Sequence, residues 1–279
     1  MSWFQQGQPV KPPKKKKQPI PATMLVRCMN MVSKEQEARE QGMLYMGNVI
    51  KLSDPEYMKK ALIEYWMPTP SSISFEKEYY TRIGNVIEDI HVSRLHSLGL
   101  TYCDKETHEE YKIKDEERGL SGRPDIILDI AKLKHYDVLG KENKSLDSMA
   151  APKPKFVVNE VKSTGSYYYK EWDFFEKLPE NYLTQFSLYV KYLYERGITD
   201  TKEGFFTIYD RDKPTPKNLW GEMRQDLIDR TYENADKFWG YVRKRAFPNV
   251  GPRLKKEWVE EQIKNQPNRV WHKLGEVNV

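Results

Sequence analysis

The sequence has little cysteine, which excludes several kinds of site. Only Cys28 and Cys103 occur among 279 residues. Two separated cysteines cannot supply the four ligands of an iron–sulfur cluster or of a cysteine-based zinc site. They also cannot form a disulfide framework, which favours a reducing compartment.

Long apolar runs are absent as well. The sequence contains no stretch of about 18 apolar residues, the length that a transmembrane helix requires. Its N-terminal residues lack the apolar segment of a secretory signal. We therefore expect a cytoplasmic protein that has no membrane partner.

Charge is abundant and slightly unbalanced. The 46 Lys and Arg residues exceed the 41 Asp and Glu residues, giving a formal net charge of +5. This bias is a weak indication of a polyanionic partner. Residues 1–23 are rich in Pro, Gln and Lys and include the cluster Lys14 to Lys17, which predicts a flexible basic arm. The arm is either a solvated tail or an electrostatic contact for phosphate or a protein.

Hydrophobic spacing and turn residues predict the secondary structure. The expected helices lie at 75–98, from Pro179 to Gly197, at 219–245 and at 255–264. The expected strands lie at 111–114, 120–130, 155–163 and 204–210, with a loop at 141–155. This order predicts an α/β fold in which helices pack on a single mixed sheet.

The same patterns divide the chain into four segments. We expect a basic arm at 1–23, a helical extension at 24–69, a core at 70–212, and C-terminal helices with a tail at 213–279.

The strand FVVNEVKST (156–164) carries two charges among apolar residues. Because side chains alternate along a strand, Glu160 and Lys162 share one face. Burying an isolated charge is costly, so both need partners or a cleft. Asp125 lies 35 residues before Glu160, at the start of an expected antiparallel strand, so the two carboxylates can meet. Each residue alone also fits a surface ion pair or ordinary turn chemistry.

Two carboxylates beside a lysine favour a particular chemistry. Carboxylate oxygens suit Mg²⁺ or Mn²⁺. Lys162 would orient or deprotonate a metal-activated water. Such an arrangement suits phosphodiester hydrolysis, because the metal stabilises charge at phosphorus and generates hydroxide near neutral pH.

The motif RPDIIL … VVNEVKS resembles the Pro-Asp … Glu-x-Lys signature of the PD-(D/E)XK nucleases. Gly84 and Glu88 in RIGNVIEDIH resemble the Gly-x-x-x-His or Gly-x-x-x-Glu element of the RecB-like exonuclease branch. Gln185 and Tyr189 resemble its Gln-x-x-x-Tyr element. The resemblance covers about residues 70–212. The chain departs from relatives that carry an iron–sulfur cluster, since it lacks the four cysteines, and it has Glu88 where many have histidine.

The resemblance implies a role for each matching residue. Asp125, Glu160 and the backbone carbonyl of Val161 would hold the metal, with Glu88 reaching it from the preceding helix. Lys162 would position or activate water, and Gln185 would orient the lysine or contact DNA. His91, one turn beyond Glu88, is a metal ligand, a DNA contact or a packed histidine.

Several further residues are candidates for contact with DNA. They are Arg123, Ser163, Thr164, Tyr167, Lys170 and Tyr189. An arginine can hold a phosphate with two hydrogen bonds, and hydroxyls can bind phosphate near a metal. The aromatic stretch SYYYKEW can stack on an unpaired base, or it can simply close the sheet.

The resemblance implies a Mg²⁺- or Mn²⁺-dependent deoxyribonuclease, with an exonuclease favoured. The expected setting is DNA recombination, repair or processing of the phage type, in the host-cell cytoplasm if the chain is viral. A structure-specific or nicking endonuclease is an alternative. So is a DNA-binding or virion structural subunit built on a nuclease fold, and a recombination or virion protein is a possible partner.

Overall fold

The computed structural model describes residues 43–66, 75–102, 111–133, 155–213, 215–251 and 256–265. The chain divides into two units, 1–41 and 42–279, and every described residue belongs to the second. The predicted arm at 1–23, most of the loop predicted at 141–155 and the tail from Gln266 lie outside the described residues.

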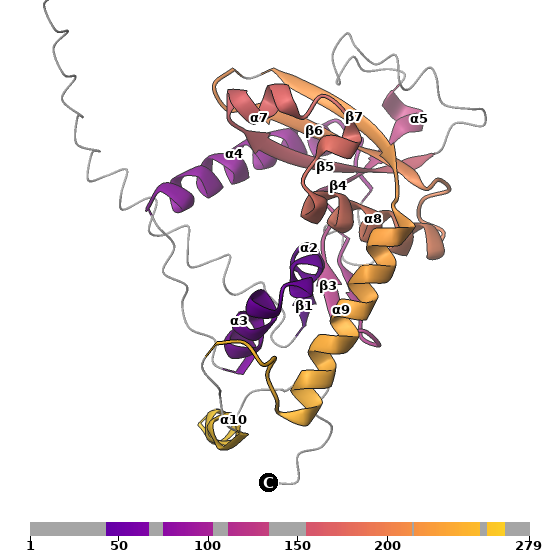
Figure 1. Ribbon diagram of the computed structural model, residues 1–279. Helices are drawn as coiled ribbons and strands as arrows, with labels where there is room; N and C mark the ends of the chain where they lie inside the picture. Colours follow the sequence, from indigo (N-terminus) through magenta and orange to yellow (C-terminus); the bar gives the residue numbers. More distant parts are fainter. Residues whose placement is uncertain are drawn as a thin grey trace, which may run out of the picture. The chain divides into compact units, whose positions relative to one another are not determined.

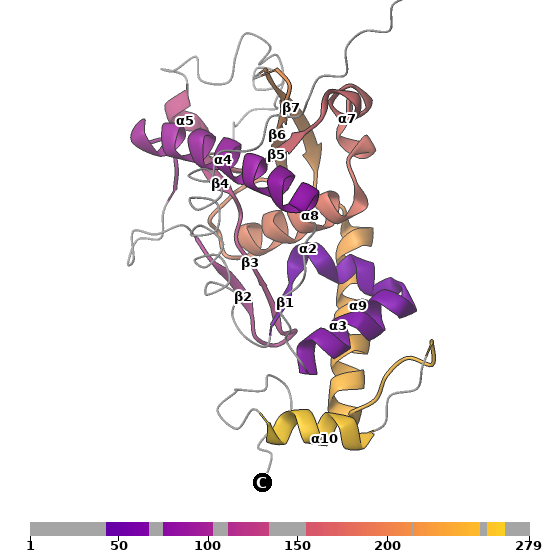
Figure 2. The same ribbon diagram turned by 90° about the vertical axis from the view of Figure 1, so that its left-hand side faces the viewer.

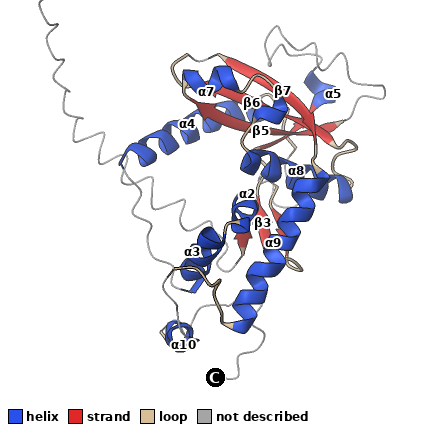
Figure 3. Cartoon of the chain, viewed as in Figure 1, coloured by secondary structure: helices blue, strands red, loops and turns tan. Residues whose placement is uncertain are grey.

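The strands form two sheets (Figures 1 and 3). The larger has the order β4-β5-β6-β7 and the smaller the order β1-β3-β2. Within the larger sheet β5 and β6 run parallel and the other pairs are antiparallel. The strands are β1 (Leu44–Tyr45), β2 (Ile113–Asp115), β3 (Leu120–Gly122), β4 (Ile126–Asp129), β5 (Phe156–Thr164), β6 (Glu203–Asp210) and β7 (Pro216–Glu222). The predicted class, a mixed α/β fold with flanking helices, is confirmed.

The prediction of one sheet was wrong. The expected strand at 120–130 is broken at Arg123-Pro124-Asp125, so that β3 joins the small sheet and β4 the large one. Pro124 has no N–H to donate to a ladder, and proline therefore ends regular pairing.

Helices connect and cover these sheets. They are α2 (Met46–Val49), α3 (Pro55–Trp66), α4 (Phe75–Ser97), α5 (Ile130–Leu133), α7 (Ser166–Glu171), α8 (Glu180–Glu195), α9 (Gln225–Lys244) and α10 (Lys256–Lys264), with 3₁₀ turns η1 (Ile50–Ser53) and η2 (Phe175–Lys177). Within the described residues, no helix is long and apolar enough to cross a lipid bilayer.

The segment around Leu219 differs from its prediction. A helix was expected at 219–245, but β7 occupies 216–222 and α9 begins only at Gln225. Leu219 is buried, and the Trp220 ring stacks on Phe205 of β6 with their centroids 4.5 Å apart. Pairing with β6 and this ring contact decide the local conformation, which spacing along the chain cannot reveal.

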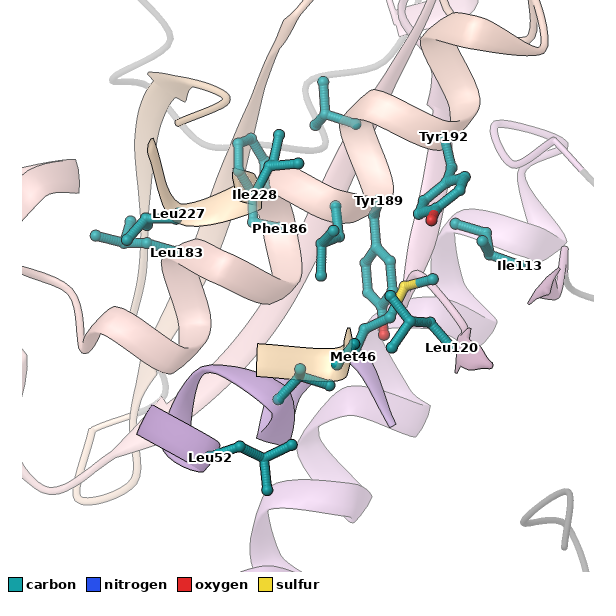
Figure 4. Packing of buried hydrophobic residues seen from close by; sticks show 14 of the residues in the cluster. Met46, Leu52, Ile113, Leu120, Leu183, Phe186, Tyr189, Tyr192, Leu227 and Ile228 are labelled. Atoms are coloured by element: carbon teal, nitrogen blue, oxygen red, sulfur yellow. The ribbon is translucent and has the colours of Figure 1, made fainter. Parts of the chain in front are cut away.

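The two faces of the large sheet support two cores. On one face Val158 of β5 packs with Phe186 of α8 and Phe206 of β6. On the other, Val157 packs with Leu95 of α4. Figures 1 and 2 show α4 and α8 beside this sheet, and Figure 4 shows part of the first core. Strand β5 is thus covered on both faces.

Candidate active site

Strands β4 and β5 bring two carboxylates together. They pair antiparallel with Ile126 opposite Asn159, which places Asp125 beside Glu160. The Asp125 N–H donates to Glu160 Oε1 over 3.1 Å. In return Asp125 Oδ2 accepts from the Val161 N–H over 2.8 Å. These reciprocal bonds fix both side chains at the point where β4 begins.

The Lys162 ammonium lies among three oxygen atoms. Its Nζ is 3.0 Å from Asp125 Oδ2, 2.9 Å from Glu160 Oε2 and 3.0 Å from the Val161 carbonyl oxygen. These three groups are among the metal ligands that the family resemblance implied, a set that also included Glu88 and His91. Their oxygens converge on one position that already holds a positive charge.

The cluster brings the carboxyl groups of Asp125, Glu160 and Glu88 near the Lys162 ammonium. Burial, and then the charge of Asp125, raise the pKa of Glu160 to about 8. The same two causes raise the pKa of Glu88 on α4 to about 7. Burial alone would lower the pKa of Lys162, but Asp125 and Glu160 hold it well above its usual range. An additional cation would favour the ionised form of these carboxyl groups.

The donor set fits a divalent ion of the Mg²⁺ or Mn²⁺ kind. Two carboxylates and a backbone carbonyl are hard oxygen ligands, and such ions keep water in their remaining positions. Among the described residues, no three Asp, Glu, His or Cys side chains are placed to hold a metal by themselves. The oxygen donors that lie together here are two side-chain carboxylates and the Val161 carbonyl, while Glu88 contributes charge nearby.

Helix α4 approaches β5 closely at Gly84. A Cβ atom at Gly84 would lie 3.2 Å from Ser163 Oγ, tighter than most such contacts. Glu88 follows one turn later on the same helix face. The glycine thus accounts for how α4 brings Glu88 within electrostatic reach of Asp125.

His91 is a packed histidine. Its Nδ1 lies 2.7 Å from the Tyr209 hydroxyl and its Nε2 lies 3.4 Å from Asn159 Oδ1. Burial lowers the pKa of His91, which favours the neutral ring. Its two nitrogens face these partners, so of the three roles left open for His91 the contacts favour the packed histidine over the metal ligand.

Gln185 and Tyr189 form a hydrogen-bonded group with Tyr45. Gln185 Nε2 lies 2.9 Å from the Tyr189 hydroxyl and 3.1 Å from that of Tyr45. The Tyr189 hydroxyl accepts from the Arg123 N–H over 3.2 Å, two residues before Asp125. Gly122 leaves room for this ring, since a Cβ there would lie 2.5 Å from it.

These contacts change two predictions. Tyr189 is fully buried, so it supports the segment before Asp125 and does not offer a surface to DNA. Gln185 bonds the two tyrosines and so acts on the site through Tyr189.

Two residues near the site escaped the sequence interpretation. Tyr45 lies in a segment that was expected to be helical, and the Tyr182 ring centroid lies 5.8 Å from Lys162 Nζ. No spacing rule marks either one. The sequence feature that comes nearest to marking Tyr45 is Gly47, two residues later. A Cβ atom at Gly47 would lie 2.9 Å from Gln185 Oε1, so this segment packs closely against Gln185.

The other predicted DNA contacts differ in exposure. Arg123, Tyr167 and Lys170 are exposed, and Ser163 is half-buried. Thr164 is buried, and its carbonyl accepts from the Arg211 N–H over 2.9 Å. A phosphate contact by the Thr164 side chain is inconsistent with that burial.

Comparisons with known proteins add only distant likenesses. The sequence matches no protein-family model and no curated protein. Among solved structures, the chain is similar to an alkaline exonuclease from Laribacter hongkongensis, at 14% identity and a TM-score of 0.46, covering 81% of this chain and 95% of that one. The same exonuclease in complex with dAMP gives the same values. SSO0001 is similar at 15% identity and a TM-score of 0.39, covering 87% and 95%. Likeness at this level carries no activity across, so function is argued from the site.

Proposed function

We propose that this chain is a metal-dependent deoxyribonuclease, and specifically an exonuclease resembling the RecB-like branch of the PD-(D/E)XK nucleases. Its work would be DNA recombination, repair or processing in the cytoplasm, of the kind phages carry out in a host cell. One observation carries the proposal. Asp125, Glu160 and the Val161 carbonyl gather three oxygens around the Lys162 ammonium.

The chemistry follows from the charges. A bound Mg²⁺ or Mn²⁺ ion would neutralise phosphate charge and lower the pKa of a coordinated water. Asp125, Glu160 and the Val161 carbonyl would hold it. Lys162 is an ammonium, because its pKa is well above the usual range. An ammonium can donate hydrogen bonds but cannot accept a proton, so Lys162 would orient a water or a phosphate oxygen and would not deprotonate water.

DNA digestion tests the proposal. Linear duplex, single-stranded and closed circular DNA would each be incubated with Mg²⁺, with Mn²⁺ and with EDTA. We expect metal-dependent release of nucleotides from linear DNA and none from the Lys162→Ala variant. Lys191→Ala is the matched control, because its side chain is 18% exposed and ion-paired, as that of Lys162 is at 16%. Equal background from wild type and Lys162→Ala would refute the catalytic role.

The substrates also separate the alternatives. Cutting of closed circular DNA would favour an endonuclease. Binding of DNA without cleavage under either metal would favour a structural or DNA-binding subunit.

A further inference from the structure

Helix α7 presents aromatic side chains to solvent directly after the lysine strand. Tyr167 is 70% exposed and Tyr168 is 56% exposed. Contiguous exposed apolar surface often marks an interaction site. The position of these two rings matters because β5, which carries Glu160 and Lys162, ends at Thr164.

These rings are the outer end of a continuous series. The ring centroids of Tyr167 and Tyr168 are 5.2 Å apart, and those of Tyr168 and Trp172 are 5.8 Å apart. Trp172 lies 5.9 Å from Tyr182. The Tyr182 ring lies 5.8 Å from Lys162 Nζ. We call Tyr167, Tyr168, Trp172 and Tyr182 the ring series; it leads from the surface to the lysine.

The charges around the ring series do not favour a purely phosphate-based contact. Lys170 and Glu171 are adjacent and exposed on α7, so the helix carries no net charge. Asp173 and Lys177 pair with each other over 2.9 Å. A ligand of the ring series would therefore gain more from its apolar faces than from its phosphates.

We propose, resting on the nuclease function proposed above, that the ring series binds an unpaired DNA strand by base stacking and leads it to Lys162. Every base has a flat face that can stack on an aromatic ring, whatever its sequence. In a duplex those faces are covered by neighbouring bases, so only an unpaired stretch can use the rings. The step from Tyr182 to Lys162 joins this surface to the cleavage site. The substrate class is thus a single strand or an unpaired end.

Binding measurements with an abasic control test this directly. The probes are a fluorescein-labelled oligodeoxythymidine of about 12 nucleotides, within the site size of single-strand binders, and an abasic strand of equal length. Both carry the same phosphates, and EDTA prevents cleavage. We expect the full chain to bind the thymidine strand at least about tenfold more tightly than the abasic one, given the stabilisation that each stacked base provides.

Variants locate the preference on the rings. Tyr167→Ala with Tyr168→Ala should abolish the preference for bases, whereas Tyr167→Phe with Tyr168→Phe should retain it, since phenylalanine keeps the stacking face. Tyr194→Ala is the control at another exposed tyrosine, 41% exposed on α8. All variants would be compared with wild type by thermal unfolding.

The outcomes are distinct. Equal affinity of wild type for the two strands, or an unchanged preference in the double alanine variant, would overturn the inference even if the protein cleaves DNA. A base preference that disappears with the alanines supports it. If wild type shows that preference but cleaves no DNA, base stacking on the ring series is supported and the proposed nuclease function is refuted.

Discussion

The two faces of strand β5 carry different kinds of buried polar group. Asn159 and Glu160 are neighbours and both are 0% exposed. Asn159 faces α4, where it donates to Thr207 Oγ1 over 2.9 Å and lies near His91. Glu160 faces the other way, beside Asp125 and Lys162. One face holds a neutral network, and the other holds charge.

This contrast distinguishes buried polar groups that stabilise the fold from buried polar groups that serve a functional site. A buried neutral network whose members are paired stabilises the fold and specifies its geometry. Buried carboxylates whose pKa values are raised cost stability, and such groups cluster at functional sites. The same strand therefore offers two matched positions at which to test the difference.

The largest effect should come from the charged face. Glu160→Gln keeps the size and one acceptor oxygen but removes a metal ligand, so we expect cleavage to fall by on the order of 100-fold or more. Because the amide needs no counter-charge, the unfolding temperature should equal or exceed that of wild type. Metal-dependent nucleotide release and thermal unfolding measure the two effects.

Two results would contradict the functional role assigned to Glu160. Wild-type cleavage by Glu160→Gln would show that the carboxylate is not a ligand. A strongly lowered unfolding temperature would show that Glu160 is structural.

The neutral face should respond in the opposite way. Asn159→Ala leaves Thr207 and His91 without this partner, so we expect a loss of about 1–3 kcal/mol in the free energy of unfolding. Cleavage per folded molecule should change far less than in Glu160→Gln. Urea denaturation and the digestion assay measure both.

Asn218→Ala is the control for this network. This variant removes Asn218 Oδ1, which accepts a hydrogen bond from Thr207 Oγ1 over 2.9 Å. Asn218 is half-buried, so water can replace it and the loss should be smaller. A larger loss for Asn218→Ala than for Asn159→Ala would contradict the burial argument.

A second buried acid, Asp115, sharpens the comparison because its carboxylate oxygens have hydrogen-bond donors. Its Oδ1 accepts from the Arg118 N–H over 2.9 Å, its Oδ2 from the Arg118 guanidinium over 3.3 Å and from the Tyr192 hydroxyl. Burial alone would raise the pKa of Asp115, but these donors hold it below its usual range. A depressed folded-state pKa contributes stability above the unfolded value of about 4, which is lost as pH falls through the folded value.

Asp115→Asn should therefore lower the free energy of unfolding by about 1–2 kcal/mol at neutral pH. The difference from wild type should begin to shrink below about pH 4, where the carboxyl of the unfolded chain takes up a proton, and should vanish at lower pH, where the folded carboxyl does so as well. Urea titrations at both pH values measure it. Glu117→Gln is the control, since Glu117 is 83% exposed and also lies near Arg118. A pH-independent difference would show that the charge of Asp115 does not matter.

The sequence predicted what depends on neighbours along the chain. Helix α4, helix α8 and strand β5 follow from local spacing, and the antiparallel order of β4 and β5 was enough to bring Asp125 to Glu160. Strand β7 was missed because its conformation depends on pairing with β6. The sequence left the role of His91 open, because tertiary packing decides which groups face its two ring nitrogens.

Tyr45 shows the same limit at the site. It belongs to a two-residue strand, β1, whose pairing partner β3 lies far along the chain. Nothing local predicts that its hydroxyl meets Gln185 and Tyr189. Long-range contacts of this kind become visible only when the chain is folded.

The smallest effect should come from this supporting group. Tyr45→Phe removes one of the two hydroxyls in this group, and the remaining bond between Gln185 and Tyr189 still holds Tyr189 in place. Tyr189→Phe also removes the acceptor for the Arg123 N–H, and with it a direct restraint on the segment before Asp125. Since one net hydrogen bond is worth about 0.5–1.5 kcal/mol, we expect a loss in kcat of about two- to tenfold for Tyr189→Phe.

The loss for Tyr45→Phe should be smaller than that, with little change in KM for either variant. Steady-state digestion of linear DNA measures both constants, and Tyr194→Phe serves as the exposed control. A greater loss for Tyr45→Phe than for Tyr189→Phe would mean that Tyr45 acts on the site directly. Its hydroxyl would then belong with the charged face of β5, because its pKa, raised chiefly by burial, also responds to the charges of Glu160 and Lys162.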